Sequence, residues 1–278
     1  MTETASAAVP APTPVGPSPV SSSALRVDGL DFARSLAFLG MVFVNYRTAI
    51  VPKASDVSWL AWINERIDGR AAATFVTLAG VGISLMSRRA RLSGDATMLS
   101  SVRQTLWRRA GFLFVIGLLY WPLWPADILH FYGVYLAIGA MLITASDRTL
   151  LVLAGSLVLA FAVLIVGGAD YSRGRQWDPL SYTGFWTPSG FLRNLVYNGF
   201  HPIIPWLSFL LFGMWLGRRD LPDSRLQSRF IEISLPVITV AELSSRWLIR
   251  KAAPKSDGDH SAQPCLPQVD VQLLGPSM

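Results

Sequence analysis

One stretch near the start of the chain decides the fold class, because it runs from alternating charges directly into an apolar segment that carries two polar residues. It reads Arg26-Val-Asp-Gly-Leu-Asp-Phe-Ala-Arg34-Ser-Leu-Ala-Phe-Leu-Gly40-Met-Val-Phe-Val-Asn45-Tyr-Arg47. The apolar run 35–51 is long enough to cross a bilayer as a helix, which takes roughly 17–25 residues. Asn45 lies about 16 Å beyond Arg34 along such a helix, so its amide is expected near the middle of the membrane.

The polar residues of this stretch fall on one side of the predicted helix. Asp31, Arg34 and Asn45 share a face at helical spacing and form a polar line from the membrane surface inward. Polar groups at membrane depth are expensive and are usually paired or functional. Asn45 therefore either hydrogen-bonds a neighbouring helix or lines a functional path. Arg34 either forms a surface ion pair with Asp31 or contacts a phosphate-bearing cofactor.

The composition of the chain extends this interpretation to the whole molecule. The 278 residues are 51% hydrophobic and only 15% charged, with a mean hydropathy of +0.40, whereas soluble domains carry about 25% charged residues. We therefore predict an all-α fold, a polytopic transmembrane helix bundle of about six to seven helices. The expected spans are 33–51, 70–87, 110–124, 128–145, 149–167, 203–217 and, more weakly, 230–249, which contains Pro236 and Glu242.

The predicted domain organisation is one helical domain between two polar tails. Residues 1–25 are rich in Ala, Pro and Ser and are predicted to be disordered. They lack the basic and apolar regions of a signal peptide, so the first helix is expected to act as an uncleaved membrane signal. The helical domain is placed at 26–249, and 250–278 is predicted to be a polar, disordered tail.

Charge placement predicts a multi-pass protein of the cell membrane with a cytoplasmic N-terminus. The predicted loop 88–109 holds six Arg against Asp95 alone, and more Arg residues follow 217. Arg residues between apolar segments follow the positive-inside pattern, which argues for the lipid bilayer, and against nucleic acid, as the partner of this basic chain. A single Cys265 and three scattered His residues argue against a disulfide or a metal site.

Candidate catalytic residues lie in the segments expected at the outer face. Asp127 and His130 are one helical turn apart, so the carboxylate and the imidazole can touch, as in a general base. His201 opens His-Pro-Ile-Ile-Pro-Trp206, whose two prolines predict a broken helix entry. The alternative is structural: Asp127 caps a helix, and His130 and His201 pack in the interface.

Candidate ligands for an anion lie at the opposite face. Arg108 and Arg109 are expected to open the helix at 110, where free backbone N–H groups favour anions. The alternative is that these residues only determine topology.

Five stretches in order resemble the heparan-α-glucosaminide N-acetyltransferase-like and YeiB-like bacterial membrane proteins of the transmembrane acyltransferase superfamily. The residues that carry the resemblance are 26–46, 68–82, 108–119, 127–132 and 199–218. The resemblance implies that acetyl-CoA or another acyl-CoA is held from the cytoplasmic side and that the acyl group passes to a sugar or small polar acceptor at the outer face. No metal is implied.

The resemblance also assigns roles to the candidate residues. Arg34, Arg108 and Arg109 would bind the acyl-CoA and Asn45 would line the acyl path. Many relatives have His where this chain has Asn45, and Asn cannot act as a base. His201 or His130, the latter with Asp127, would then be catalytic.

Other departures from the family keep alternatives open. The predicted loop 52–69 contains no His, and relatives continue for several more helices, so the chain is expected to lack the family's C-terminal helices. A non-enzymatic transporter or permease, or a truncated inactive homologue, is therefore the alternative. The acceptor, the acyl chain and a homodimeric state are left open.

Overall fold

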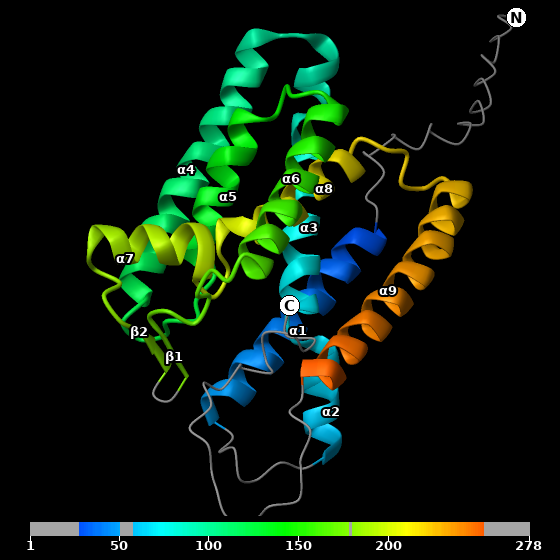
Figure 1. Ribbon diagram of the computed structural model, residues 1–278. Coiled ribbons are helices and arrows are strands. Elements are labelled where there is room, and N and C mark those ends of the chain that lie inside the picture. Colours follow the sequence, from blue (N-terminus) through cyan, green and yellow to red (C-terminus); the bar gives the residue numbers. More distant parts are fainter. Residues whose placement is uncertain (1–27, 51–57, 178–179, 253–278) are drawn as a thin grey trace, which may run out of the picture.

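The computed structural model describes residues 28–50, 58–177 and 180–252. The predicted tails lie outside these ranges, apart from residues 250–252, which continue the last helix. The described elements are α1 (Asp28–Ile50), α2 (Ser58–Ile67), α3 (Arg70–Ser93), α4 (Ala96–Tyr120), α5 (Leu129–Met141), α6 (Asp147–Val166), β1 (Arg175–Trp177), β2 (Leu180–Tyr182), α7 (Pro188–Arg193), the π-helix η1 (Asn194–Asn198), α8 (Ile203–Leu216) and α9 (Ser224–Ala252). The structure is a helical bundle with one small antiparallel hairpin (Figure 1). The predicted all-α class is confirmed.

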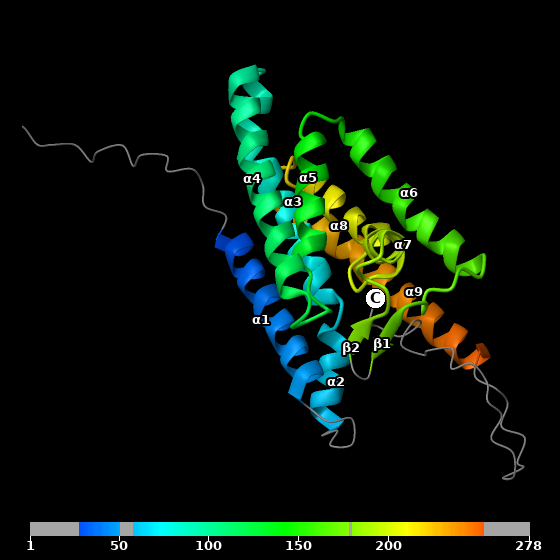
Figure 2. The same ribbon diagram turned by 90° about the vertical axis from the view of Figure 1, so that its left-hand side faces the viewer.

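The core forms where α3, α5 and α8 meet in the middle of the bundle. α4 packs along α5, α3 packs along α8, α6 covers α8, and α1 lies against α3 (Figure 2). Phe131 and Tyr135 of α5, Leu210 and Met214 of α8 and Val76 of α3 are almost fully buried. α5 is therefore enclosed, so its side chains reach several neighbouring elements.

Glycines allow these helices to approach closely. A Cβ on Gly213 of α8 would overlap the carbonyl of Thr77 in α3, and a Cβ on Gly117 of α4 would overlap the backbone N of His130 in α5. Small residues at crossings are typical of membrane helix pairs, where van der Waals contact drives association. These contacts set how α5 and α8 present their polar residues.

The prediction of a loop at 88–109 is wrong, because almost all of these residues are helical. α3 continues to Ser93 and α4 begins at Ala96. The turn is confined to Gly94, which has a positive φ of 67°, and Asp95, whose carboxylate accepts the N–H groups of Thr97 and Met98. Arg is a good helix former, so hydropathy marks the end of the apolar segment and not the end of the helix.

Two further predicted loops contain regular structure. Helix α2 lies within 52–69, and the hairpin, α7 and η1 lie within 168–202. The broken entry predicted before Trp206 is confirmed, since Ile204 has φ −98° and ψ 115° inside α8.

Two described helices, α3 and α6, are long and apolar enough to cross a membrane. The pair Pro188–Asn198 and Ile203–Leu216, bent by 49°, would be a third span if it crosses as one unit. α9 includes the predicted weak span but does not meet this criterion, and its residues 231–240 are exposed. A total of six to seven crossings stays a prediction.

Candidate functional site

One end of the bundle is basic and is held together by arginines. The α3–α4 turn, the α5–α6 turn and the end of α8 meet there, at the top of Figure 1. Arg218 donates to the carbonyl of Ala145 and to Asp147 Oδ1, both at 2.7 Å, and Arg219 also pairs with Asp147. Arg91 donates to the carbonyl of Ser84 at 3.2 Å. These arginines therefore have structural partners that fix α8 to the start of α6 and stabilise the end of α3.

The charges of Arg34 in α1 and Arg109 in α4 both act on Tyr132 in α5. Arg34 Nη1 donates to Asp31 Oδ1 at 3.1 Å, and both side chains are about half exposed. This is the ion pair that one interpretation of Arg34 predicts. The guanidinium groups of Arg34 and Arg109 both interact electrostatically with the phenol of Tyr132, which lies against the ring of Phe75 at 5.7 Å. Two cations from different helices thus act on one residue of α5.

The structure separates Arg108 from Arg109. Both lie in the second half of α4 and not at its start, so the expected contribution of free helix N–H groups to anion binding is wrong. Successive helical residues point about 100° apart. Both side chains are exposed, but among the described residues only the charge of Arg109 in this pair acts on Tyr132. The two arginines therefore differ in their direction around α4.

Asn45 is hydrogen-bonded to another part of the bundle. Trp124 Nε1, in the connection between α4 and α5, donates to Asn45 Oδ1 at 3.2 Å. This is the hydrogen bond to a neighbouring segment that one of its two interpretations predicts. It ties the end of α1 to the segment that leads into α5.

Asp127 and His130 lie close together but do not form a hydrogen bond. Asp127 Oδ2 accepts the backbone N–H of Leu129 at 2.8 Å and lies 3.9 Å from His130 Nδ1. That separation exceeds hydrogen-bond range. His130 is 0% exposed, and neither of its ring nitrogens has a partner among the described residues. The carboxylate thus shapes the start of α5, while the imidazole keeps its full hydrogen-bonding capacity.

His201 lies just before α8, next to the same helix α5. Its carbonyl oxygen accepts the hydroxyl of Tyr135 at 2.6 Å, and its ring contacts Trp206 at 4.7 Å between centroids. The structural alternative for His201, a place beside Trp206, is therefore observed. Its Nδ1 is nevertheless buried without a partner in the described part of the chain. Tyr135 fixes the backbone, so the imidazole position is set by the fold.

Sequence reasoning missed Asn194. Its side chain is 1% exposed, and neither its Oδ1 nor its Nδ2 finds a hydrogen bond within the described residues. It opens the π-helix η1, in a segment predicted to be a loop. The only available signal was a pair of asparagines, Asn194 and Asn198, four residues apart in an aromatic stretch.

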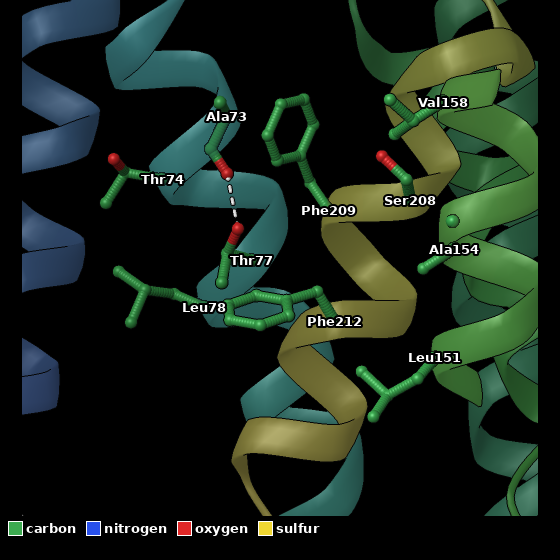
Figure 3. Close-up of a pocket in the computed structure, with 11 residues that line it drawn as sticks. Ala73, Thr74, Thr77, Leu78, Leu151, Ala154, Val158, Ser208, Phe209 and Phe212 are labelled. Carbon is green, nitrogen blue, oxygen red and sulfur yellow. Dashed lines mark hydrogen bonds between the residues drawn. The ribbon is translucent and has the colours of Figure 1, made fainter. Parts of the chain in front are cut away.

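A hollow elsewhere in the described part of the bundle does not contain these residues. It has a volume of about 580 Å³ and is lined by α3, α6 and α8 (Figure 3). Its walls are mainly apolar, with Phe209, Phe212 and Leu151, and its polar members include Thr77, which donates to the carbonyl of Ala73 at 2.9 Å. None of the candidate catalytic or acyl-CoA-binding residues lines it.

No cluster in the described ranges has the composition of a metal site, because nowhere do three or more His, Cys, Asp or Glu residues come together. The residues that converge are Arg, Tyr, His and Asn. These side chains bind anions or exchange protons and hydrogen bonds.

The long apolar helices, the basic end and the buried imidazole nitrogens, which have no hydrogen-bond partner among the described residues, indicate a class of membrane protein with a polar site in its interior. The chain belongs to the heparan-α-glucosaminide N-acetyltransferase catalytic family, whose model matches residues 26–248. The predicted family resemblance is confirmed, and the chain is an acetyltransferase-like membrane protein. Acetyl-CoA is the donor used by acetyltransferases of this type. No curated protein and no solved structure matches the chain.

Proposed function

We propose that the protein is a multi-pass acyltransferase of the cell membrane that moves an acetyl group from cytoplasmic acetyl-CoA to a sugar or another small polar acceptor at the outer face. The observation that carries this proposal is the first turn of α5. The charges of Arg34 and Arg109 act on Tyr132 there, and His130, two residues earlier, is buried with no hydrogen-bond partner for either ring nitrogen among the described residues. Residues two apart on a helix point to different sides, so an anionic donor beside Tyr132 and a proton acceptor at His130 would lie at the same level of the bundle, on different sides of α5.

The donor end of this proposal rests on positive charge. Coenzyme A carries phosphates, and guanidinium groups bind phosphate by strong, often bidentate, charge-assisted hydrogen bonds. Arg34 and Arg109 are the proposed ligands, and Arg108 is available at the surface of the same helix. The basic end that contains the α3–α4 turn would face the cytoplasm, as the positive-inside pattern requires.

The acceptor end rests on the imidazoles. An acceptor hydroxyl or amine attacks the thioester carbonyl and its proton passes to the imidazole of His201 or His130. The C–S bond then breaks, and the coenzyme A thiolate leaves and takes up that proton. A neutral imidazole has a free ring nitrogen that can accept this proton.

The donor site is tested by measuring acetyl-CoA binding to the purified full-length protein. Arg109→Ala and Arg34→Ala are each expected to weaken binding about tenfold or more, the effect of losing one charge-assisted hydrogen bond. Arg108→Ala is the matched control, because it removes the same charge one residue away and is expected to have a smaller effect. Absence of binding by the unmodified protein, or equal effects of Arg108→Ala and Arg109→Ala, would contradict the proposal.

Transport without acyl transfer is the second candidate function. The hydrogen bond from Trp124 to Asn45 favours it, because it gives a structural role to the amide that stands where many relatives have His. Uptake of a labelled sugar into vesicles without any acyl donor would support transport. A strict requirement for acetyl-CoA would support the transferase.

A further inference from the structure

Two buried asparagines occupy the same π-helix, and their hydrogen bonding differs. Asn194 begins η1 and Asn198 ends it, and they are 1% and 0% exposed. Asn198 Oδ1 accepts the hydroxyl of Tyr182 at 2.7 Å, and its Nδ2 donates to the carbonyls of Arg173 at 2.8 Å and Tyr171 at 3.2 Å. Neither amide atom of Asn194 has a partner among the described residues. Residue type, element and burial are matched, so hydrogen bonding is the difference.

Asn198 therefore has a structural role, whereas the side chain of Asn194 forms no hydrogen bond that stabilises the described part of the chain. Asn198 joins η1 to the segment before and within the hairpin. A buried amide without a partner is destabilising, because it loses its hydrogen bonds to water and gains none in return. Such groups are rare in native proteins, and π-helical turns are frequent at functional sites. The unpartnered amide of Asn194 therefore indicates a hydrogen-bonding group that comes from outside the described residues.

The surroundings of Asn194 bring it to the two imidazoles. A Cβ on Gly199 would overlap both Asn194 Oδ1, at 2.9 Å, and Phe131 Cζ, at 2.6 Å, so these two atoms lie close to each other against this glycine. The ring of Phe131 lies 3.9 Å from that of His130 and 6.2 Å from that of His201, measured between centroids. Buried polar atoms without partners are thus gathered around one phenyl ring.

We propose that Asn194 binds the acyl acceptor, by hydrogen-bonding an uncharged hydroxyl or amide group of a sugar beside His130 and His201. The identity of the ligand as an acceptor rests on the proposed transferase function. An amide offers two N–H donors and an acceptor oxygen, which suits hydroxyl groups that both donate and accept.

The charges around this site favour a neutral ligand. Asp127 lies 3.9 Å from His130 Nδ1, and Arg175 of β1 acts electrostatically on His201. These two charges have opposite signs, and the remaining walls include the rings of Phe131 and Trp206. A charged ligand would lose its hydration without a net counter-charge to replace it.

The test compares Asn194→Leu with Asn198→Leu in the full-length protein, because leucine has a similar shape and no polar atoms. Asn194→Leu is expected to leave the unfolding temperature unchanged or to raise it by about 2–4 °C. Asn198→Leu is expected to lower it, since three hydrogen bonds are lost. In the absence of acyl-CoA, N-acetylglucosamine should raise the unfolding temperature of the unmodified protein but not that of Asn194→Leu. Protonated glucosamine should raise the unfolding temperature of the unmodified protein less than N-acetylglucosamine does.

Three results would overturn the inference: Asn194→Leu as destabilising as Asn198→Leu, a full sugar-induced shift in Asn194→Leu, or no shift in the unmodified protein. Acetyl transfer from acetyl-CoA is measured on the same samples. A sugar-induced shift that depends on Asn194, in a protein without transfer activity, would support the binding site and contradict only the transferase function. Transfer that Asn194→Leu leaves unchanged would instead contradict the role of Asn194 in acceptor binding.

Discussion

The fold shifts the pKa values of two carboxylates in helix connections in opposite directions. Burial raises the pKa of Asp68, between α2 and α3, although a hydrogen bond from the backbone N–H of Gly69 partly opposes this. The hydroxyl of Thr97 and the N–H groups that Asp95 caps lower the pKa of Asp95 in the α3–α4 turn. The folded state therefore favours protonated Asp68 and ionised Asp95.

Asp68→Asn is expected to raise the unfolding temperature at neutral pH, because it removes a charge that burial disfavours. The stability contributed by protonated Asp68 is lost as pH rises through the folded pKa. The advantage of Asn should therefore disappear as pH falls below the ordinary Asp pKa of about 3.9. Scans of unfolding temperature against pH measure this.

Asp95→Asn is the control, because the fold lowers the pKa of Asp95 and the substitution is expected to have the opposite effect on stability. It should lower the unfolding temperature at neutral pH, and its deficit should close as pH falls through the depressed folded pKa. A loss of stability in Asp68→Asn at neutral pH would mean that the ionised carboxylate has a favourable partner.

The sequence predicted most of the candidate residues but not how they are grouped. The positions of Arg34, Asn45, His130 and His201 follow from residue type at a given place in an apolar segment. Asn194 could not be found in this way, because burial without a partner is a property of the tertiary structure. The choice of Arg109 over Arg108 likewise depends on which face of α4 packs against α5, and Gly117 and Gly133 lie at that contact.

At the scale of elements, the crossing of α3 and α8 controls the position of the polar site. Gly80 of α3 faces the carbonyl of Leu210, and Gly213 of α8 faces the carbonyl of Thr77, so backbone lies against backbone. No flexible side chain can move aside here. The start of α8 is joined to α5 through Tyr135 and His201, so a shift of α8 would displace His201.

Gly213→Ala is expected to destabilise the protein by about 1–3 kcal/mol, because an added methyl group must push α3 and α8 apart. Gly111→Ala in α4 is the matched control, since no atom lies within 4 Å of its Cβ position. Alanine favours a helix over glycine by about 1 kcal/mol, so this control should be neutral or stabilising. Unfolding temperatures in one detergent measure both. Equal effects would contradict the close packing.

Hydropathy located the apolar segments but not the ends of the helices. The predicted spans 70–87 and 149–167 correspond to α3 and α6, because their apolar runs exceed what a soluble helix carries. The helical part of 88–109 was missed, because its arginines are polar yet favour helix. The pair Gly94–Asp95 indicates the short turn, because Gly favours the left-handed conformation that ends a helix and Asp favours the N-cap position that begins one.

The whole molecule has a basic end and an aromatic end, joined by α4. Ser101 lies near the start of α4, and the end of α4 is marked by Trp121, whose ring stacks on Phe185 at 3.9 Å, just before α7. Positively charged loops are retained on the cytoplasmic side of the membrane. The proposed orientation therefore places Ser101 inside the cell and Ser189 of α7 outside.

Cysteine labelling in intact cells checks this orientation, after Cys265→Ser removes the one native thiol. A membrane-impermeant maleimide should modify Ser189→Cys in intact cells and Ser101→Cys only after permeabilisation. Both side chains are exposed, so burial does not limit either reaction. The reverse pattern would show that the basic end faces outward.

The central claim is that this bundle transfers an acetyl group, and the most direct measurement uses the purified protein in vesicles with radiolabelled acetyl-CoA and a panel of hexoses and hexosamines. The account predicts a labelled sugar product. It also predicts that the double variant His130→Gln, His201→Gln still binds acetyl-CoA but loses transfer by about 100-fold or more, as expected when a general base is removed. Folded protein that binds acetyl-CoA but labels no acceptor, or a double variant as active as the unmodified protein, would contradict it.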